Sequence, residues 1–185
     1  QLVKRVAVEV LHQDEISYER FRKKHEPGQS QLKLQRETRF AWEPKFSILV
    51  PLYKTKPEYL KELVSSVQAQ TYRNWELCLS DGSGENSPIR ELLERMEKQD
   101  SRIRVISHDR PLKISENTNA AMEKASGDFL VFADHDDLLA PNALYECVKL
   151  LNGQDRLELI YSDEDKVTMD GRKYFQPHFK SDYNP

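Results

Sequence analysis

The sequence predicts an α/β fold, a mainly parallel sheet with helices on both faces, and 185 residues are sufficient for one ordinary domain with a core. Two observations favour this fold. From residue 45 onwards, short apolar runs typical of buried strands alternate with segments whose apolar residues recur at helical spacing. Strands that alternate with helices in this way favour parallel pairing through crossover connections.

Five apolar runs are expected to form the strands. They span residues 46–50, 75–79, 103–106, 129–132 and 157–161. Pro51 is expected to stop the first strand, because proline cannot donate to a ladder of hydrogen bonds. The fourth strand is expected to be covered on both faces, as strands of parallel sheets usually are.

Four helices are expected between and after these strands. Their apolar stripes are Leu60, Leu63, Val64 and Val67; Ile89, Leu92, Leu93 and Met96; Ile114, Thr118, Ala121, Met122 and Ala125; and Leu144, Cys147, Val148 and Leu151. Pro57 suits the first turn of the first helix, and Pro141 is expected to open the last one. Gly127 is expected to cap the C-terminus of the third helix.

Residues 1–44 are expected to be a helical extension or the end of a preceding module, and residues 45–185 the main domain. Residues 3–11 carry apolar side chains at helical spacing, a charged stretch follows at residues 17–24, and residues 31–40 suit a further short helix. The segment is too polar to form a core alone, and its pattern indicates no function.

Composition excludes several classes of function. With 28 basic against 31 acidic residues and a net charge of −3, the chain has no polybasic stripe, so no nucleic-acid partner is expected. No apolar run reaches the length of a membrane span, and no secretory signal is visible. Cys78 and Cys147 lack metal-ligand spacing, which favours reduced, mostly buried thiols in a cytoplasmic protein. Gln1 and Pro185 are unusual ends, so we expect a piece of a longer protein.

Three carboxylates, Asp134, Asp136 and Asp137, directly follow the fourth expected strand. In an extended segment alternate side chains share a face, so Asp134 and Asp136 would point together and His135 away. Two oxygen donors at a strand end suit a hard divalent cation such as Mg²⁺ or Mn²⁺. Taken alone, the same residues are explained equally well by a solvated acidic turn before a helix.

The position of two further clusters favours a ligand site. Pro51-Leu52-Tyr53 follows the first expected strand, and Asp81-Gly82-Ser83 follows the second. In open parallel sheets, ligands bind beyond the carboxyl ends of the strands, where these clusters and the acidic one would meet.

The side chains of these clusters suit a nucleoside diphosphate that carries a transferable group. Tyr53 could stack on a nucleobase, with a tyrosine packed in a loop as the alternative. Asp81 can accept a hydrogen bond from the imide N3–H of uracil or thymine. Lys113 falls where a basic residue could reach a phosphate, with a solvated lysine as the alternative. A cation held by Asp134 and Asp136 would neutralise the charge of a leaving diphosphate.

Several motifs together resemble the ordered signature of family 2 glycosyltransferases with the GT-A (Rossmann-like) fold. They are Phe46-Ser47-Ile48-Leu49-Val50-Pro51-Leu52-Tyr53, Val67-Gln68-Ala69-Gln70-Thr71-Tyr72, Ser80-Asp81-Gly82-Ser83, Asn119-Ala120-Ala121 and Asp134-His135-Asp136-Asp137. The stretch Tyr161-Ser162-Asp163-Glu164-Asp165-Lys166 resembles the bacterial branch associated with O-antigen and other surface polysaccharides. The resemblance covers residues 45–185.

The resemblance implies an inverting, metal-dependent enzyme that moves a sugar from a UDP- or dTDP-linked donor to a glycan or a lipid-linked acceptor. Asp81 matches the aspartate that contacts the base, with Tyr53 beside it on the nucleotide. Asp134 and Asp136 match the outer residues of the DXD motif. Asp136 would bind Mn²⁺ or Mg²⁺ directly, with Asp134 on the ribose or on the metal through water. Asp137 matches an acidic position near the donor sugar.

Two departures from the family pattern lie at the nucleotide end. The family often has Asn where Lys54 stands and a second Asp where Ser80 stands, so both departures concern base and donor preference. The family's catalytic base lies well C-terminal of the DXD motif, usually beyond the length present here. Downstream, Asp163, Glu164 and Asp165 are candidates for the base, for the lining of the donor or acceptor side, or for a simple turn. We therefore expect this chain to bind a nucleotide but to transfer sugar poorly or not at all.

Three rival interpretations remain open. A nucleotidyltransferase of the same fold usually has a glycine-rich loop after the first strand, and residues 51–56 contain no glycine. A phosphoesterase would need further histidines near the metal, for which His108 after the third strand is a candidate. The third rival is a non-catalytic nucleotide-sugar-binding or scaffolding module. The expected location of the protein is the cytoplasm, with peripheral contact to the inner face of the cell membrane through regions outside this chain.

Overall fold

The computed structural model describes residues 17–154 and 156–181, so the helix expected at residues 3–11 lies outside the described residues. The chain forms two compact units. We call Gln29–Arg156 the sheet unit, and Gln1–Gly28 together with Leu157–Pro185 the hairpin unit.

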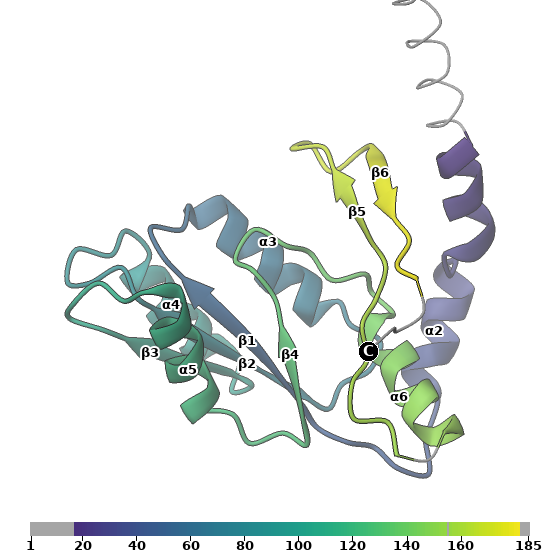
Figure 1. The fold of residues 1–185 in the computed structure, drawn as a ribbon, viewed down its shortest axis with the longest axis horizontal. Helices are drawn as coiled ribbons and strands as arrows, with labels where there is room; N and C mark the ends of the chain where they lie inside the picture. The colour runs from purple at the N-terminus through teal and green to yellow at the C-terminus, as the bar shows by residue number, and fades with distance from the viewer. Residues whose placement is uncertain (1–16, 155, 182–185) are drawn as a thin grey trace, which may run out of the picture. The chain divides into compact units, whose positions relative to one another are not determined.

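The sheet unit contains the expected parallel sheet. Its strands are β1 (Phe46–Leu52), β2 (Trp75–Asp81), β3 (Ile103–Ser107) and β4 (Phe129–Phe132). They pair in the order β3-β2-β1-β4, and every pair is parallel (Figure 1). The prediction of a mainly parallel sheet is confirmed, and four of its five expected strands are present.

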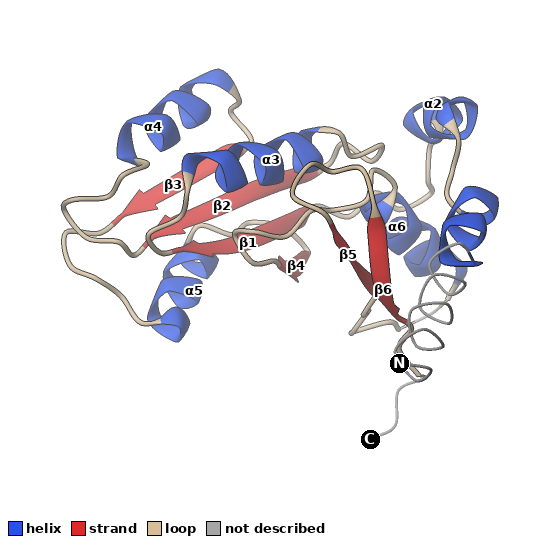
Figure 2. Cartoon of the chain, turned by 90° about the horizontal axis from the view of Figure 1, so that it is seen from above, coloured by secondary structure: helices blue, strands red, loops and turns tan. Residues whose placement is uncertain are grey.

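Helices cover both faces of this sheet, as predicted. The helices α3 (Pro57–Gln68) and α4 (Arg90–Gln99) lie on one face, and α5 (Ile114–Glu123) lies on the other (Figure 2). The unit also contains α2 (Gln29–Glu37) and α6 (Ala143–Gly153). None of the helices within residues 17–154 and 156–181 combines the length and the apolar character that a membrane crossing requires.

The core lies where β1 and β2 meet the helices. All seven residues of β2 are buried, and so are six of the seven in β1. The whole apolar stripe predicted for α3 is buried, as are Leu144, Val148 and Leu151 of α6. Both cysteines are free thiols, with Cys78 buried and Cys147 half-buried, as expected.

The stripe predicted for α5 is partly wrong. Ile114 and Met122 are 70% and 43% exposed, and the buried residues of the helix are Asn117, Ala120 and Ala121. Small side chains on this face let the helix approach the strands closely. The predicted stripe is therefore right at Ala121 and wrong at Ile114 and Met122.

Gly127 is not the helix cap that the sequence predicts. The helix α5 ends at Glu123, with Lys124 as its C-cap. A Cβ atom on Gly127 would lie 2.6 Å from the Lys45 carbonyl oxygen and 2.7 Å from Ser47 Oγ. Glycine is needed here because the chain that enters β4 crosses the start of β1 with no room for a side chain.

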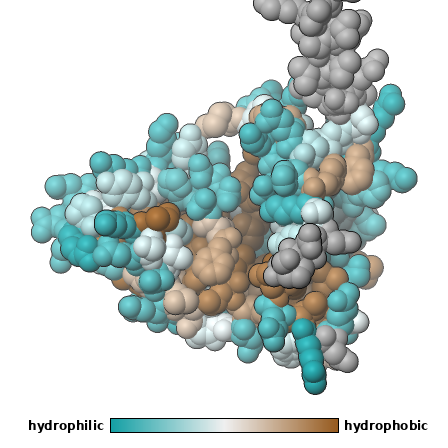
Figure 3. Space-filling view, viewed as in Figure 1, coloured by the Kyte–Doolittle hydropathy of each residue, from teal (hydrophilic) through white to brown (hydrophobic). Residues whose placement is uncertain are grey.

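The strand β4 is not covered on both faces, contrary to expectation. It is an edge strand that pairs only with β1 in the described sheet. Leu130 is 39% exposed and Phe132 is 68% exposed, and apolar side chains gather over this strand in Figure 3. A continuous apolar run thus marks a strand but does not show how many neighbours cover it.

The fifth expected strand, residues 157–161, is also wrong. These residues are irregular, and Leu159 is 68% exposed. The hairpin unit instead contains an antiparallel pair, β5 (Glu164–Val167) and β6 (Tyr174–His178). A short apolar run becomes a strand only where it pairs with a neighbour, and within the described residues this run pairs with no strand.

A buried carboxylate joins the amino ends of the strands. Glu76 of β2 is 1% exposed and accepts hydrogen bonds from Lys45 Nζ and Ser47 Oγ, each at 2.6 Å. Arg104 Nη2 of β3 lies 3.1 Å away, and Ser126 Oγ donates at 3.0 Å. Burial would raise the pKa of Glu76, but the hydrogen bonds from Lys45, Ser47 and Ser126 outweigh it and lower the pKa to about 2.

We expect Glu76→Gln to lower the free energy of unfolding and to make that free energy depend less on pH in acid. A pKa lowered from 4.5 to about 2 corresponds to roughly 3 kcal/mol. Because the folded-state pKa lies below the unfolded one, this stability is complete above pH 4.5 and is lost as the pH falls towards 2. Urea unfolding of both proteins between pH 2 and pH 7 measures it. The control is Glu62→Gln, an exposed glutamate of α3. Identical pH profiles for wild type and Glu76→Gln would contradict the assignment.

Candidate functional site

The carboxyl ends of the four strands meet at one edge of the sheet. In the strand register Leu52 lies opposite Asp81, and Asp81 lies opposite Ser107. On the other side of β1, the backbone N–H of Ala133 donates to the Leu49 carbonyl at 3.2 Å. The chain runs from β1 to β2 and β3 on one side, whereas β4 lies on the other, so β1 and β4 flank a topological switch point. Ligands of open α/β sheets bind at such a point.

Asp81 presents one carboxylate oxygen that has no partner. The residue is 1% exposed, and its Oδ1 accepts from the backbone N–H of Ser83 at 3.1 Å. Its Oδ2 is buried and has no hydrogen-bond partner among the described residues. Because a buried acceptor without a donor costs about 1–3 kcal/mol, this oxygen is suited to receive an N–H group from a ligand.

Asn117 is a site residue that the sequence analysis missed. Its Nδ2 donates to the Leu52 carbonyl at 2.8 Å, and its Oδ1 is buried without a partner in the described part of the chain. Its amide also lies against Gly82, where a Cβ atom would come within 2.8 Å of Nδ2. Its spacing in the sequence could have revealed it. Asn117 lies three residues before Ala120 and four before Ala121, so the three side chains share the buried face of the helix.

Tyr53 and Lys54 form the turn after β1. Tyr53 is 47% exposed, so its ring is accessible. Lys54 adopts a φ of 49°, and its backbone N–H donates to Ser83 Oγ at 2.9 Å, which ties this turn to the loop after β2. Asparagine tolerates a left-handed backbone better than lysine does. This preference is a physical reason for the asparagine that the family resemblance leads us to expect at position 54.

Pro51 does not end the first strand, because β1 continues to Leu52. The carbonyl of Leu49 points towards β4. Backbone groups two residues apart in a strand point to the same side, so the backbone nitrogen of Pro51 also points towards β4. The strand β4 ends at Phe132, and no ladder bond is left there for a proline to break. Pro51 therefore lies at the candidate site without removing a hydrogen bond from the sheet.

The acidic cluster forms a turn and is not extended, so the alternation argument for Asp134 and Asp136 fails. The backbone N–H of Asp137 donates to the Asp134 carbonyl at 3.1 Å, and Asp137 Oδ2 accepts from the Asp134 N–H at 3.2 Å. Asp134 and Asp136 are exposed, and His135 Nδ1 lies 3.3 Å from Asp136 Oδ1. The cluster follows β4, which pairs in parallel with β1, so it lies on the carboxyl edge of the sheet that also carries Asp81.

The acidic turn has the chemistry of a partial cation site. Within residues 17–154 and 156–181, no group of three or more His, Cys, Asp or Glu side chains is arranged to hold a metal ion. Two exposed carboxylates are hard oxygen donors that fit Mg²⁺ or Mn²⁺, provided that a ligand and water supply the remaining positions. Such incomplete protein ligation is usual where a metal binds together with phosphates.

Lys113 is exposed and directly precedes α5. Its backbone N–H donates to Glu116 Oε2 at 3.1 Å, and this bond together with Arg110 lowers the pKa of Glu116. The Lys113 side chain is thus placed at a helix N-terminus, a position that favours anions.

His108, the histidine of the phosphoesterase interpretation, lies 3.0 Å from Ser80 Oγ through its Nε2.

The three candidate base residues lie in the hairpin unit and are engaged there. Asp165 Oδ2 accepts from the Tyr18 hydroxyl at 2.5 Å, and burial together with this bond raises the pKa of Tyr18. Asp163 Oδ1 accepts from the backbone N–H of Lys180 at 2.8 Å, and Glu164 Oε2 lies 3.5 Å from Lys180 Nζ. Their assignment as the catalytic base stays a prediction.

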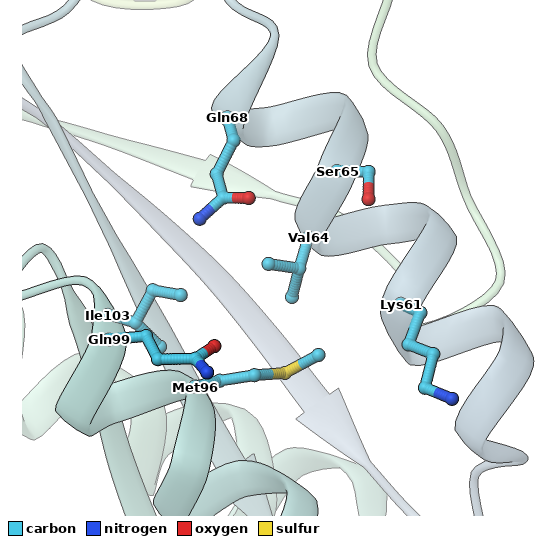
Figure 4. A pocket seen from close by; sticks show the side chains of 7 residues that line it. All are labelled: Lys61, Val64, Ser65, Gln68, Met96, Gln99 and Ile103. Carbon is cyan, nitrogen blue, oxygen red and sulfur yellow. The ribbon is translucent and has the colours of Figure 1, made fainter.

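A cavity of ≈ 120 Å³ lies between α3 and α4 over the start of β3 (Figure 4). Val64, Met96 and Ile103 are among the side chains that line it, and none of the predicted site residues does. This cavity is therefore separate from the carboxyl edge.

A family model described as "Glycosyl transferase family 2" matches residues 47–180, a range that includes every one of the predicted site residues. The chain belongs to this family. Its sheet is that of the GT-A fold, because solved glycosyltransferases of this type superimpose on it. TarS of S. aureus does so with a TM-score of 0.52 and 21% identity, over 59% of this chain and 32% of TarS. The mannosyltransferase PcManGT of Pyrobaculum calidifontis gives 0.52 and 20%, over 65% of this chain and 37% of its own.

Two curated relatives resemble this family 2 chain more closely in sequence. The protein y4gI of Sinorhizobium fredii is 38% identical over 141 residues, which cover 76% of the chain. The O-antigen biosynthesis protein RfbC of Myxococcus xanthus is 31% identical over 147 residues, which cover 80% of the chain. The chain spans only 15% of the first relative and 12% of the second.

The contact between Gly82 and Asn117 yields a stability prediction for this family 2 chain. Gly82→Ala is expected to lower the free energy of unfolding by about 1–3 kcal/mol, because the new methyl group would overlap the Asn117 amide. Urea denaturation measures the change. Gly153→Ala is the matched control, since nothing lies within 4 Å of a Cβ atom there. An equal response of the two variants would show that the Gly82 contact is not tight.

Proposed function

We propose that this chain is the donor-binding region of an inverting, metal-dependent family 2 glycosyltransferase. The donor is a UDP- or dTDP-linked sugar, and the acceptor is a glycan or a lipid-linked glycan of a bacterial surface polysaccharide. One observation carries the proposal: the unpartnered Oδ2 of buried Asp81 lies on the same sheet edge as Tyr53 and the acidic turn.

In this proposal the nucleobase binds between Tyr53 and Asp81. The exposed ring of Tyr53 stacks on the base, and Asp81 Oδ2 accepts the imide N3–H. Pro51 shapes the floor next to them, and Lys113 at the start of α5 attracts the diphosphate. Uracil and thymine present the same N3–H, so Asp81 serves UDP and dTDP alike.

Asp134 and Asp136 would hold Mn²⁺ or Mg²⁺, with Asp136 as the direct ligand and Asp137 towards the donor sugar. The cation, when bound, stabilises the negative charge of the departing nucleoside diphosphate. The chain's own contribution is to hold these carboxylates next to the topological switch point. Asp137 Oδ2 accepts a hydrogen bond from the Asp134 N–H and so closes the turn that carries them. The structure of PcManGT in complex with GDP-Man and Mn²⁺ supports metal use by this fold.

Inversion requires a base that takes the proton of the acceptor hydroxyl while that oxygen attacks the anomeric carbon and the diphosphate leaves. Asp163, Glu164 and Asp165 remain candidates for it. Each of them is engaged within the hairpin unit, which favours a base from a further segment of the protein over these three. The chain alone would then bind a donor and transfer sugar poorly or not at all.

The names of two relatives support this acceptor class. One is named for O-antigen biosynthesis, and a further relative, 35% identical over 99 residues, is an Escherichia coli glucosyltransferase acting on a diphosphoundecaprenol-linked sugar. A lipid-linked acceptor would place the protein in the cytoplasm at the inner face of the cell membrane.

The domain division that belongs to this proposal is a helical extension at residues 1–44 and a truncated GT-A domain at residues 45–185.

A second candidate function is a non-catalytic nucleotide-sugar-binding or scaffold module. The local engagement of Asp163 and Asp165 favours it, because carboxylates that hold a hairpin together are poor bases. The two functions differ in whether binding depends on a metal.

We expect UDP or dTDP to raise the melting temperature only when Mn²⁺ is present. A ligand at one hundred times its Kd stabilises the folded state by about 2.7 kcal/mol, which a thermal-shift assay detects. Asp136→Ala should abolish the Mn²⁺-dependent part, because a direct metal ligand is lost. Glu94→Ala, an exposed carboxylate of α4, is the control. Binding without any need for metal would favour the scaffold function, and absence of binding would refute the donor site.

Tyr53→Ala is expected to weaken nucleotide binding, since stacking of a base on an aromatic ring contributes about 1–3 kcal/mol. The change corresponds to a rise in Kd of roughly 5- to 150-fold. Calorimetric titration of UDP in Mn²⁺ measures it. Tyr53→Phe, which keeps the ring and removes the hydroxyl, should bind like wild type. If Tyr53→Ala also binds like wild type, the ring does not contact the base.

A further inference from the structure

Arg90, the first residue of α4, connects two loops of the carboxyl edge. Its Nη2 donates to the Gly84 carbonyl at 3.0 Å, in the loop after β2, and to the His108 carbonyl at 3.2 Å, in the loop after β3. This nitrogen carries two N–H groups, one for each carbonyl. Hydrogen bonds from a charged donor are stronger than neutral ones, so the guanidinium holds the two loops together.

Arg90 also carries one donor group that remains unsatisfied within the described part of the chain. Its Nε is buried and has no hydrogen-bond partner among residues 17–154 and 156–181. A buried donor without a partner costs about 1–3 kcal/mol. The cost is tolerated where the side chain has a further role, and the two loops that it joins indicate that role.

Both loops hold Asp81. The backbone N–H of Ser83, in the first loop, donates to Asp81 Oδ1 at 3.1 Å. The backbone N–H of His108, in the second loop, donates to the Asp81 carbonyl at 3.3 Å. The direction of the unpartnered Oδ2 therefore depends on where both loops lie, and Arg90 fixes one loop against the other.

The two loops also touch each other directly. Ser83 forms an isolated antiparallel bridge with Pro111, and the Leu112 N–H donates to the Gly82 carbonyl at 3.0 Å. Gly84 has a φ of 87°, and a Cβ atom there would lie 3.2 Å from Pro111. The contact leaves little room for other arrangements, so a change in one loop is transmitted to Asp81.

We propose that Arg90 is a positioning residue for base recognition: it clamps the loops after β2 and β3 and thereby aims Asp81 Oδ2 at the nucleobase. The proposal rests on the proposed donor site. Arg90 acts through Asp81 and does not itself need to touch the nucleotide.

The test compares two nucleotides that differ at N3. Uracil carries an N3–H that Asp81 can accept, whereas N3 of cytosine is itself an acceptor. Titrations of UDP and CDP, each with Mn²⁺, into the wild-type protein should give a Kd ratio of tenfold or more in favour of UDP. Arg90→Met should reduce this ratio below threefold, because Asp81 loses its fixed direction. A purely structural loss would weaken both nucleotides equally and leave the ratio unchanged.

Two further variants complete the test. Arg102→Met removes an arginine that packs 3.7 Å over the Trp75 ring and pairs with Asp100 at 2.8 Å, near the amino end of the sheet. It should keep the wild-type ratio. Arg90→Lys keeps the charge and should retain part of the discrimination, and its ratio decides the matter if Arg90→Met does not fold.

The outcomes separate the two proposals. If wild type binds neither nucleotide, the donor site itself is refuted, and the role of Arg90 with it. If wild type prefers UDP and the Arg90 variants keep that preference, only the role of Arg90 is overturned.

Discussion

The buried carboxylate of Glu76 is the interaction on which the geometry of the sheet unit depends. It joins Lys45 and Ser47 of the β1 end, Arg104 of β3 and Ser126 before β4. A parallel pair that slips by one residue would move every later residue to the wrong face. By fixing the register at the amino ends, Glu76 determines that the strand carboxyl ends fall side by side.

Anchoring and recognition occupy opposite ends of the same strands. Glu76 and Asp81 are both on β2, five residues apart, which is about 17 Å along a strand. The amino end carries a carboxylate whose partners are complete, whereas the carboxyl end keeps acceptors on Asp81 and Asn117 without partners. Changes at sites this far apart usually have additive effects, so the binding edge can vary while the register holds.

The sequence allowed the sheet, the helix layers and the location of the candidate site to be predicted, because apolar periodicity and strand-end clusters are local signals. Other features depend on neighbours that a linear pattern does not show. Phe132 looks buried until the sheet edge is known, and residues 157–161 look like a strand until no partner is found. Arg90 and Asn117 look like solvated helix residues, and their roles arise only from carbonyl groups distant in the chain.

The left-handed backbone of Lys54 has a consequence for how a ligand would be received. A non-glycine residue with a φ of 49° carries about 1–3 kcal/mol of conformational strain, which the hydrogen bond to Ser83 Oγ helps to hold in place. The turn that presents Tyr53 is thus already restricted before any ligand arrives. Less conformational entropy would therefore be lost when a ligand ring packs against Tyr53, and this preorganisation would favour affinity.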